Sequence, residues 1–407
     1  MEKHILVVSQ YFYPEQFRIN DIVKEWTERG YKVTVLTGIP NYPQGSFYKG
    51  YGLFKRQRES YEGADVIRIP IFPRGKNAIM LSLNYLSFVF SGYIWKIFTK
   101  LKVDYVFIFE VSPMTQALPA IAYAKKKKIP SYIYVQDLWP ENFEMLSGIK
   151  NKQIIKIIGL MVDYIYKNSA KIFTTSKSFM ESIRQRGVPN NKVVYWPQYA
   201  EDFYQPISNS KNENIDESKF NFIFTGNVGL SQGLDILVDL VRTLEDERNH
   251  NKIVFNIVGD GRYKDELIEK IRNYKVEKFF NFIPKQPPEA IPFLLSSSDV
   301  AFLSLNPDPL FDKTIPAKLQ SYMSCGMPIL ASSNGETNRI IDEAKAGYHA
   351  PAGDIQALKK QVLKFVNIPS EKLEKLSENS LKYAQENFNK KKLMNEIETY
   401  FEVGDEE

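Results

Sequence analysis

The chain has 407 residues, 43% of them hydrophobic, and this length suits two or three domains better than a single core. The net charge of +5 is mild, and the Lys and Arg residues form no dense stripe with interleaved aromatic residues, which argues against nucleic-acid binding. The single cysteine, Cys325, excludes an internal disulfide and favours a reducing compartment. The apolar run near the N-terminus is too short for a signal peptide, so we expect a cytoplasmic protein.

Short apolar runs alternate with helical patterns through the first half of the chain. The predicted strands are His4–Gln10, Lys32–Thr37, Asp65–Ile71, Tyr105–Glu110, Ser131–Gln136, Lys171–Thr175 and Lys192–Trp196. The predicted helices are Asn20–Arg29, Ala78–Phe98, Met114–Lys127, Asn151–Lys167 and Ser178–Arg186. Apolar runs separated by helices favour a parallel sheet that is covered on both faces.

Residues 78–95 contain no charged side chain, although they include several Ser, Asn and Gly residues. Their length is borderline for a transmembrane helix, which needs ~20 mostly apolar residues. Because parallel strands require a crossover helix at this point, the segment is interpreted as that helix rather than as a span.

Residues 204–217 are polar and lack periodicity, so they are interpreted as a linker. A second alternating series follows, with predicted strands at Phe220–Thr225, Ile253–Val258, Phe279–Ile283, Val300–Leu305 and Pro328–Ala331. The last two helical stretches, Ser370–Asn387 and Lys390–Phe401, are followed by no strand, and the final one is expected to pack back on the first domain.

Together these patterns predict an α/β fold of two doubly wound, Rossmann-like domains that face a cleft, with ligands at the carboxyl ends of the strands. The first domain is expected to span residues 1–203 and to receive the helix at 388–407. The second is expected to span residues 218–387.

The most informative segment is residues 222–238, where an apolar strand runs into a turn rich in glycine and then into an amphipathic helix. The glycines are Gly226, Gly229 and Gly233. Such a turn aims backbone amides and a helix N-terminus at one point, which favours an anion such as a phosphate. The alternative is an ordinary turn between a strand and a helix.

A second helix start at residues 313–318 provides another candidate for anion binding, through Thr314, Ile315, Pro316 and Lys318. Two such sites on one sheet suggest a diphosphate held between them, and therefore a nucleotide-activated substrate. Lys285 is a further candidate cation. The pair Gly259 and Gly261 is a weaker candidate for the same site, since it lacks a third glycine. Lys318 is alternatively a solvated helix lysine.

Several classes of chemistry are disfavoured by what the sequence lacks. None of the three histidines, His4, His250 and His349, lies beside a credible nucleophile, and His349 is placed near a Gly-Tyr turn. There is no Cys/His cluster with zinc spacing and no Asp-x-Asp pair to hold a divalent ion on a diphosphate. We therefore expect no metal and no cofactor apart from the nucleotide-linked substrate.

Polar side chains in the first half follow the predicted strands and are expected to line the cleft. The segment after the first strand contains Tyr13, Glu15 and Arg18, and Arg18 is placed near a phosphate or an acceptor unless it only caps a helix. The fifth strand is followed by Asp137, Trp139 and Glu141, two carboxylates and an indole that are typical of a sugar site. Trp139 is alternatively a core residue. Glu110 ends the fourth strand and adds a third carboxylate.

Over essentially its whole length the chain resembles the retaining family 4 glycosyltransferases of GT-B fold. Within them it is most similar to the bacterial branch that includes N-acetyl-fucosaminyl transferases of surface-polysaccharide assembly. The segments that carry the resemblance are residues 10–15, 38–43, 135–140, 226–230 and 316–323. The resemblance implies that the first domain binds the acceptor and the second binds the nucleotide-sugar donor.

The chain also departs from the family pattern. The family places an Arg and a Lys on the donor diphosphate, where this chain has Asn227 and Gln232. It places two glutamates near the donor sugar and the ribose, where this chain has Lys313 and Ser321, and its acceptor-side His is matched by Asp137.

The reaction implied by the resemblance is the metal-independent transfer of a hexosyl group from a nucleotide diphosphate sugar, UDP-linked by expectation, with retention of anomeric configuration. An N-acetylated deoxyhexose is the expected sugar, for capsule, O-antigen or exopolysaccharide synthesis. In this scheme Asp137, Glu110 and Arg18 act near the reacting atoms.

The expected acceptor is a saccharide linked to a lipid diphosphate, with no nucleic-acid partner. Residues 78–100 and Lys125–Lys128 would then face the cytoplasmic side of the inner membrane, to which the protein would bind peripherally. The lysine run is alternatively a solvated helix end. Two rival functions remain: a UDP-sugar 2-epimerase of the same fold, and a non-catalytic sensor of nucleotide sugars.

Overall fold

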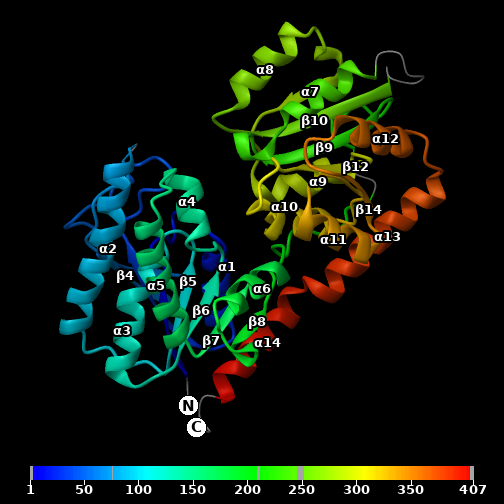
Figure 1. Cartoon of the computed structure of the whole chain (residues 1–407). Coiled ribbons are helices and arrows are strands. Elements are labelled where there is room, and N and C mark those ends of the chain that lie inside the picture. Colours follow the sequence, from blue (N-terminus) through cyan, green and yellow to red (C-terminus); the bar gives the residue numbers. More distant parts are fainter. Residues whose placement is uncertain (1–2, 76, 209–210, 245–251, 404–407) are drawn as a thin grey trace. The chain divides into compact units, whose positions relative to one another are not determined.

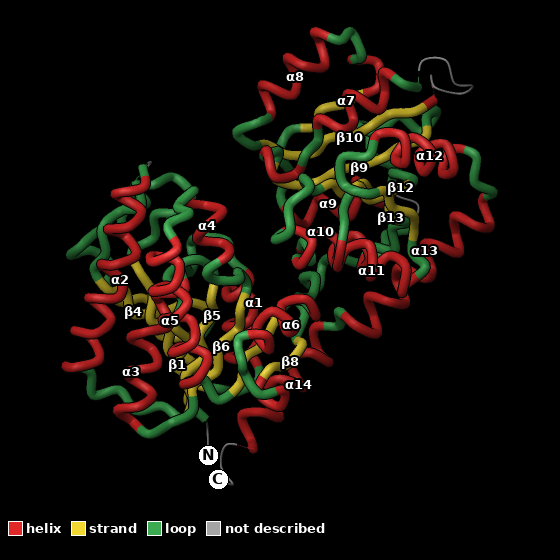
Figure 2. The backbone as a smooth tube through the Cα atoms, viewed as in Figure 1, coloured by secondary structure: helices red, strands yellow, loops and turns green. Residues whose placement is uncertain are grey.

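The computed structural model describes residues 3–75, 77–208, 211–244 and 252–403. The chain folds into two compact units, Met1–Trp196 with Thr399–Glu407, and Pro197–Glu398 (Figure 1). The boundary therefore lies at Trp196, whereas the sequence placed it at residue 203. Residues 388–398 belong to the second unit. In each unit, strands alternate with helices along the chain (Figure 2).

The first unit is built on an eight-stranded sheet with the order β3-β4-β2-β1-β5-β6-β7-β8. Its strands are β1 (His4–Val8), β2 (Lys32–Gly38), β3 (Arg58–Tyr61), β4 (Ala64–Ile69), β5 (Tyr105–Glu110), β6 (Ser131–Val135), β7 (Lys171–Thr174) and β8 (Val193–Tyr195). All neighbouring strands are parallel except β3, which pairs antiparallel with β4 at the edge. The parallel order brings the carboxyl ends of β1, β5 and β6 to one edge of the sheet.

The helices of the first unit cover both faces of this sheet. They are α1 (Arg18–Glu28), α2 (Ala78–Phe98), α3 (Ala117–Lys127), α4 (Glu141–Ser147), α5 (Lys152–Asn168) and α6 (Lys177–Gln185). Trp26 of α1 packs edge-on against Phe107 of β5 and lies 5.7 Å from the ring of Phe401. Phe401 belongs to α14 (Lys390–Val403), and also stacks on Tyr105, so the last helix ends within the core of the first unit.

Helix α2 is long and apolar enough to cross a membrane by length and composition. One face of it is nonetheless docked in the first unit, because Asn84, Phe88 and Gly92 are buried. A Cβ atom on Gly92 would approach the Pro119 side chain of α3 to 2.7 Å, so the two helices are in close contact. This contact is what a crossover helix requires.

The second unit is built on a six-stranded parallel sheet with the order β11-β10-β9-β12-β13-β14. Its strands are β9 (Phe220–Asn227), β10 (Ile253–Asp260), β11 (Phe280–Ile283), β12 (Val300–Ser304), β13 (Ile329–Ser332) and β14 (Gly347–Ala350). Its helices are α7 (Asp235–Arg242), α8 (Lys264–Asn273), α9 (Ile291–Ser296), α10 (Ala317–Ser324), α11 (Gly335–Ala344), α12 (Ile355–Val366) and α13 (Ser370–Asn387). Separate apolar clusters fill the two faces of this sheet, which is why its strands are apolar throughout.

The segment predicted as a linker, residues 204–217, has no helix or strand in its described part, and residues 209–210 lie outside the description. Ile215 nevertheless is buried in one apolar cluster of the second unit. The segment therefore packs on that unit rather than only joining the two.

Two strands and one short helix are among the elements that were not predicted. Strand β3 has alternating exposed and half-buried residues and is polar, and β14 is a short edge strand. His349, which the sequence placed near a turn, lies within β14, where its Nε2 is 3.0 Å from Asp342. The third element is the short helix α4, which directly follows Pro140.

Candidate functional site

The glycine-rich turn follows β9, an inner strand of the second sheet. In the parallel register, Gly226 and Gly259 lie side by side at the ends of β9 and β10. A Cβ atom on Gly259 would overlap the carbonyl oxygen of Gly226, and the φ of Gly259 is +142°, so glycine alone fits without strain. The Val228 amide donates to the Asp260 carbonyl (2.9 Å) and ties the two loops together. Backbone without side chains lets an anion approach closely.

The second half of the turn is held by the loop after β12. Gly233 adopts a φ of +56°, and a Cβ atom there would overlap the Asn306 side chain. The Asn306 amide group in turn donates to the Leu230 carbonyl (2.6 Å), and its backbone amide donates to Ser231 (3.0 Å). These bonds fix the turn just before α7 begins at Asp235.

Lys318 in the first turn of α10 carries a cation over this turn. Its Nζ lies 3.8 Å from the centroid of the Phe224 ring, and 3.8 Å from the point that a Cβ on Gly226 would occupy. It also donates a hydrogen bond to Gln232 Oε1. Burial lowers the pKa of Lys318 to about 7. The two segments singled out in the sequence thus meet in one site on the second unit.

The buried phenol of Tyr322 explains why α10 lies there, because its hydroxyl accepts a hydrogen bond from the Thr225 amide (2.8 Å). The remaining donor-site residues fall into two groups. Asn227, Gly229 and Gly261 belong to the glycine loops, where a Cβ on Gly261 would overlap the Val228 carbonyl. The other group lies around the start of α10. The Thr314 hydroxyl donates to carbonyls of the preceding turn, and the Ser321 hydroxyl donates to the Ala317 carbonyl. Ile315 is buried, and Pro316 is the N-cap of the helix.

Lys285 is a predicted donor-site residue that lies away from the glycine turn. It is exposed beyond the end of β11, the edge strand, and β10 separates that strand from β9. Among the described residues it makes no side-chain hydrogen bond or ion pair with the glycine turn. We therefore do not count it in the site.

We expect Gly259→Ala to destabilise the second unit by about 2–4 kcal/mol, because the new methyl group meets a backbone carbonyl at a positive φ. Unfolding in urea, followed by far-ultraviolet circular dichroism, measures this effect. Gly353→Ala is the matched control: its φ is +80° but its nearest neighbour is an ordinary 3.9 Å away, so about 1–2 kcal/mol is expected. Equal losses for the two variants would contradict the close approach of the two loops.

In the first unit, two carboxyl groups lie together at the ends of β5 and β6. Glu110 is fully buried, its Oε1 has no hydrogen-bond partner among the described residues, and its Oε2 is 3.4 Å from the Asp137 amide nitrogen. Burial, reinforced by the charge of Asp137, holds the pKa of Glu110 well above its usual range. Burial also raises the pKa of Asp137. Burial therefore disfavours the charged form of Glu110, which is less accessible than Asp137.

Ser112 organises this pair from the loop after β5. Its amide donates to Asp137 Oδ2 (2.7 Å), and its hydroxyl accepts from Trp139 Nε1 (3.1 Å) and from Asn142 Nδ2 (2.5 Å). Trp139 is only 5% exposed and packs on Phe143, which fits the alternative of a core residue and not a contact with the acceptor sugar. Its role is to hold the loop that carries Asp137.

Glu15 was predicted to contact the acceptor, but the structure gives it another role. Its carboxylate is buried and accepts hydrogen bonds from the amides of Phe12 (3.1 Å), Asn41 (2.7 Å) and Tyr42 (2.7 Å). Burial raises the pKa of Glu15 to about 7 despite these bonds. Glu15 therefore joins the loops after β1 and β2 and is not available to a ligand.

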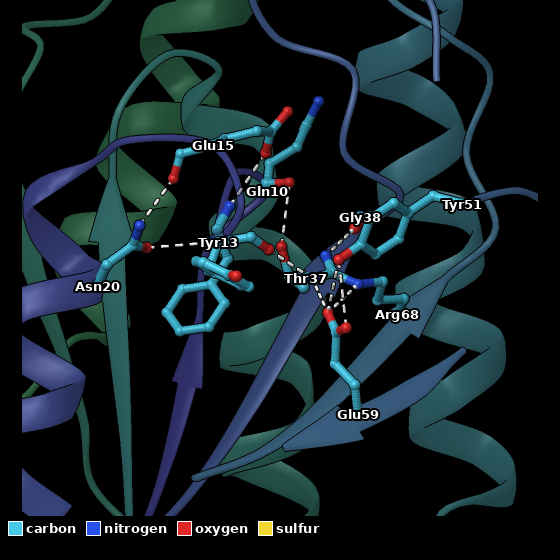
Figure 3. A network of polar contacts seen from close by, with 10 residues as sticks. Gln10, Tyr13, Glu15, Asn20, Thr37, Gly38, Tyr51, Glu59 and Arg68 are labelled. Atoms are coloured by element: carbon cyan, nitrogen blue, oxygen red, sulfur yellow. Dashed lines mark hydrogen bonds and ion pairs between the residues drawn. The ribbon is translucent and has the colours of Figure 1, made fainter. Parts of the chain in front are cut away.

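Arg68 holds the same loops from β4 (Figure 3). Its guanidinium donates to the carbonyls of Tyr13 and Gly38 and pairs with Glu59 of β3. Tyr13 is 43% exposed, with its ring 4.7 Å from that of Tyr61, so it remains open to a ligand.

Arg18 is the first residue of α1 and half-buried, and its charge opposes the rise that burial causes in the pKa of Tyr134. Glu141 is half-buried at the start of α4.

His4 is bonded to Thr34 within the sheet, and His250 lies outside the described residues. The part of the chain that the structure describes holds no group of three His, Cys, Asp or Glu residues that would bind a metal ion.

Sequence reasoning missed a cation and three phenols that lie together in the first unit. Arg74, in the loop after β4, donates from Nη1 to the Tyr11 hydroxyl (2.9 Å), and its guanidinium lies 5.1 Å from the ring centroid of Tyr42. Tyr85 of α2 faces the same group. The only signal in the sequence was the position of each residue after a strand or on a helix, which does not reveal that they meet.

Comparison with known proteins identifies both units. Residues 207–383 match the family model described as glycosyl transferases group 1, and residues 16–198 match the glycosyl transferase 4-like domain. The chain belongs to the group 1 glycosyltransferases. The matches to the two models correspond closely to the two units of this glycosyltransferase, and its two Rossmann-like units give it the GT-B fold.

One relative of this glycosyltransferase is WcaI of Escherichia coli, named as a colanic acid biosynthesis glycosyl transferase. The two chains are 25% identical over 342 residues, which are 79% of this chain and 81% of the relative. Among solved structures, sucrose-phosphate synthase from Thermosynechococcus elongatus has a TM-score of 0.77 at 14% identity, over 99% of each chain. HepE of Anabaena in complex with UDP has a TM-score of 0.71 at 14% identity, over 99% of this chain and 100% of HepE. At these identities the solved structures show the fold alone.

Proposed function

We propose that this glycosyltransferase transfers a sugar from a UDP-sugar to a saccharide linked to a lipid diphosphate, with retained anomeric configuration, in the synthesis of a surface polysaccharide. The relative WcaI is named for colanic acid biosynthesis, and HepE has been solved with UDP and with UDP-glucose. These relatives support the substrate classes. An N-acetylated deoxyhexose as the donor sugar rests on the resemblance of the sequence segments alone.

The observation that carries the proposal is the meeting of Lys318 with the glycine turn in the second unit. The turn presents backbone at Gly226 and Gly259, and Lys318 Nζ lies 3.8 Å from the point that a Cβ on Gly226 would occupy. A diphosphate bound there is neutralised by the lysine and by backbone amides without a metal ion. Lys318 thereby takes the place of the cations that the family has where this chain carries Asn227 and Gln232.

In the proposed reaction, the bond between the anomeric carbon and the UDP oxygen breaks as the acceptor oxygen bonds to the same face of that carbon. The acceptor proton passes to the leaving phosphate oxygen. Asp137 supports the positive charge that develops on the sugar, and Ser112 and Glu110 hold Asp137 in place.

The outer face of α2 supports peripheral binding to the cytoplasmic face of the membrane. Its exposed apolar residues recur at spacings of three and four and so lie on one stripe: Ile79, Leu83, Leu86, Phe90, Ile94 and Ile97. Lysines cluster nearby in sequence and space, since Lys126 donates to the carbonyls of Lys96 and Ile97 at the end of α2. An apolar stripe beside a basic cluster is complementary to an anionic lipid surface.

The proposal is tested by incubating the purified full chain with a panel of UDP-sugars and a prenyl-diphosphate-linked saccharide, and by measuring UDP release and the product. We expect UDP release with one donor and a product of retained configuration. Binding of UDP-sugars without release in every combination would favour the sensor, and a new UDP-sugar formed without acceptor would favour the epimerase.

Binding of UDP is expected to take up a proton at alkaline pH. Lys318 has a pKa of about 7 in the folded chain, so at pH 8 it is mostly neutral, and the bound diphosphate restores its charge. We expect uptake of about one proton per UDP at pH 8 and an affinity that falls about tenfold per unit above pH 7. Calorimetry in buffers of different ionisation enthalpy measures the uptake. Lys318→Met should abolish it, and uptake that persists in this variant would contradict the assignment.

A further inference from the structure

The first unit contains a cation that no part of the reaction described above uses. Arg74 is half-buried, and among the described residues no carboxylate forms an ion pair with it. Its backbone amide donates to Asn41 Oδ1 (2.9 Å), which fixes the loop, while its Nη1 donates to the Tyr11 hydroxyl (2.9 Å). A guanidinium has five N–H donors, so this arrangement leaves most of them for a ligand.

Aromatic rings surround this guanidinium on one side. Tyr11, Phe17 and Tyr42 pack against one another with ring centroids 5.2–5.5 Å apart, and Arg74 lies over the rings of Tyr42 (5.1 Å) and Tyr11 (6.0 Å). Stacking of this kind holds the planar group in one orientation. The guanidinium is therefore positioned in advance for an oxyanion, as phosphate recognition by arginine requires.

Tyr85 of α2 is the third phenol near Arg74. Burial raises the pKa of Tyr85, the Arg74 charge and a hydrogen bond with Tyr11 oppose that rise, and the Asp137 charge adds to it. The Tyr85 hydroxyl thus lies within electrostatic reach of both Arg74 and Asp137.

The loop between β4 and α2 carries an exposed apolar residue, Phe72, close to Arg74 in the sequence. The Asn84 amide group, on the inner face, donates to the Phe72 carbonyl (2.6 Å), so Phe72 is tied to the middle of the helix. Phe72 itself is 55% exposed and lies two residues before Arg74. The loop therefore places an exposed apolar side chain next to a cation, beside the apolar stripe of α2.

We propose that Arg74, with the phenols of Tyr11, Tyr42 and Tyr85, forms a phosphoryl-binding site for the diphosphate of a prenyl-linked acceptor. The prenyl chain remains in the lipid layer that α2 contacts, next to Phe72, and the diphosphate reaches Arg74. This inference deepens the proposed function, on which the identity of the acceptor rests.

The test is equilibrium binding of farnesyl diphosphate and of inorganic pyrophosphate to the full chain, with UDP at saturation so that the donor site is filled. We expect farnesyl diphosphate to bind more tightly than pyrophosphate, and Arg74→Gln to weaken both by about 10- to 100-fold. Arg74→Lys should recover part of the loss. The control Arg58→Gln changes an exposed arginine of the edge strand β3 and should bind as the unaltered chain does.

Unchanged binding in Arg74→Gln overturns the site. Equal affinities for the two probes overturn the lipid source of the phosphate and leave a site for free phosphates. The melting temperature of each variant shows whether a loss reflects unfolding, and Arg74→Lys provides a second reading of the same site if Arg74→Gln does not fold. Failure of the proposed function would appear separately, as no UDP-dependent transfer by the unaltered chain while farnesyl diphosphate still binds.

Discussion

Replacing Lys318 with methionine is expected to weaken UDP binding by about 10- to 100-fold, the value of one charge-assisted hydrogen bond in a partly buried site. Methionine has a similar length and keeps the contact with the Phe224 ring, but it brings no charge to the glycine turn. The effect should be large because Asn227 and Gln232, which stand where the family has cations, are neutral. Titration calorimetry with UDP at pH 7 measures the change in affinity.

The matched control is Lys372→Met, since Lys372 is an exposed lysine of α13 with no described ion pair. It should bind UDP as the unaltered chain does. Lys318→Arg should keep part of the affinity, because it retains the charge while the longer, planar group fits the buried position less well. Full affinity in Lys318→Met would mean that the backbone amides of the turn are sufficient, and the charge at α10 would then have no part in donor binding.

The elements of this fold that sequence reasoning could predict are those whose burial leaves a mark on the sequence. Parallel strands buried on both faces have continuous apolar runs, so strands such as β5, at Tyr105–Glu110, were predicted to the residue. Strand β3 lies at an edge, pairs antiparallel and exposes half of its side chains, so its sequence, Arg-Glu-Ser-Tyr, has no apolar run to detect. Its place is set by Arg68, which reaches it from β4.

The same distinction holds for the candidate site. The glycine turn directly follows strand β9, and Lys318 lies in the first turn of helix α10, which follows strand β12 of the same sheet. Because the carboxyl ends of parallel strands meet at one edge of a sheet, the proximity of the turn and Lys318 could be predicted from their positions in the sequence. Position does not reveal the direction of a side chain. Trp139 and Glu15 follow strands as predicted, yet both turn inward and bond to neighbouring loops.

Arg74 illustrates what remains hidden in a single sequence. Its partners are Tyr11, from the loop after β1, and Tyr85, from the middle of α2. Tyr11 is 63 residues from Arg74 along the chain, and nothing in the local sequence of the three residues indicates that they meet. A site of this kind requires the tertiary structure.

Replacing Asp137 with asparagine is expected to lower kcat for sugar transfer by ~100- to 1000-fold, because it removes a preorganised negative charge from the reacting centre. Asparagine preserves the side-chain size, and its oxygen can still accept from the Ser112 amide, so the loop should keep its structure. The affinity for UDP should not change, since the glycine turn and Lys318 belong to the other unit. Initial rates with donor and acceptor at saturation, together with UDP titration, separate the two effects.

Glu110→Gln provides the comparison that isolates charge from structure. Because burial shifts the pKa of Glu110 well above its usual range and so favours the uncharged carboxyl group, an amide of the same shape should have little effect on kcat. For Asp137, whose pKa is also raised by burial, the charged form is gained as the pH rises, so kcat should increase with pH along an acidic limb that Asp137→Asn removes. A large loss in Glu110→Gln with none in Asp137→Asn would transfer the catalytic role from the accessible carboxyl to the buried one.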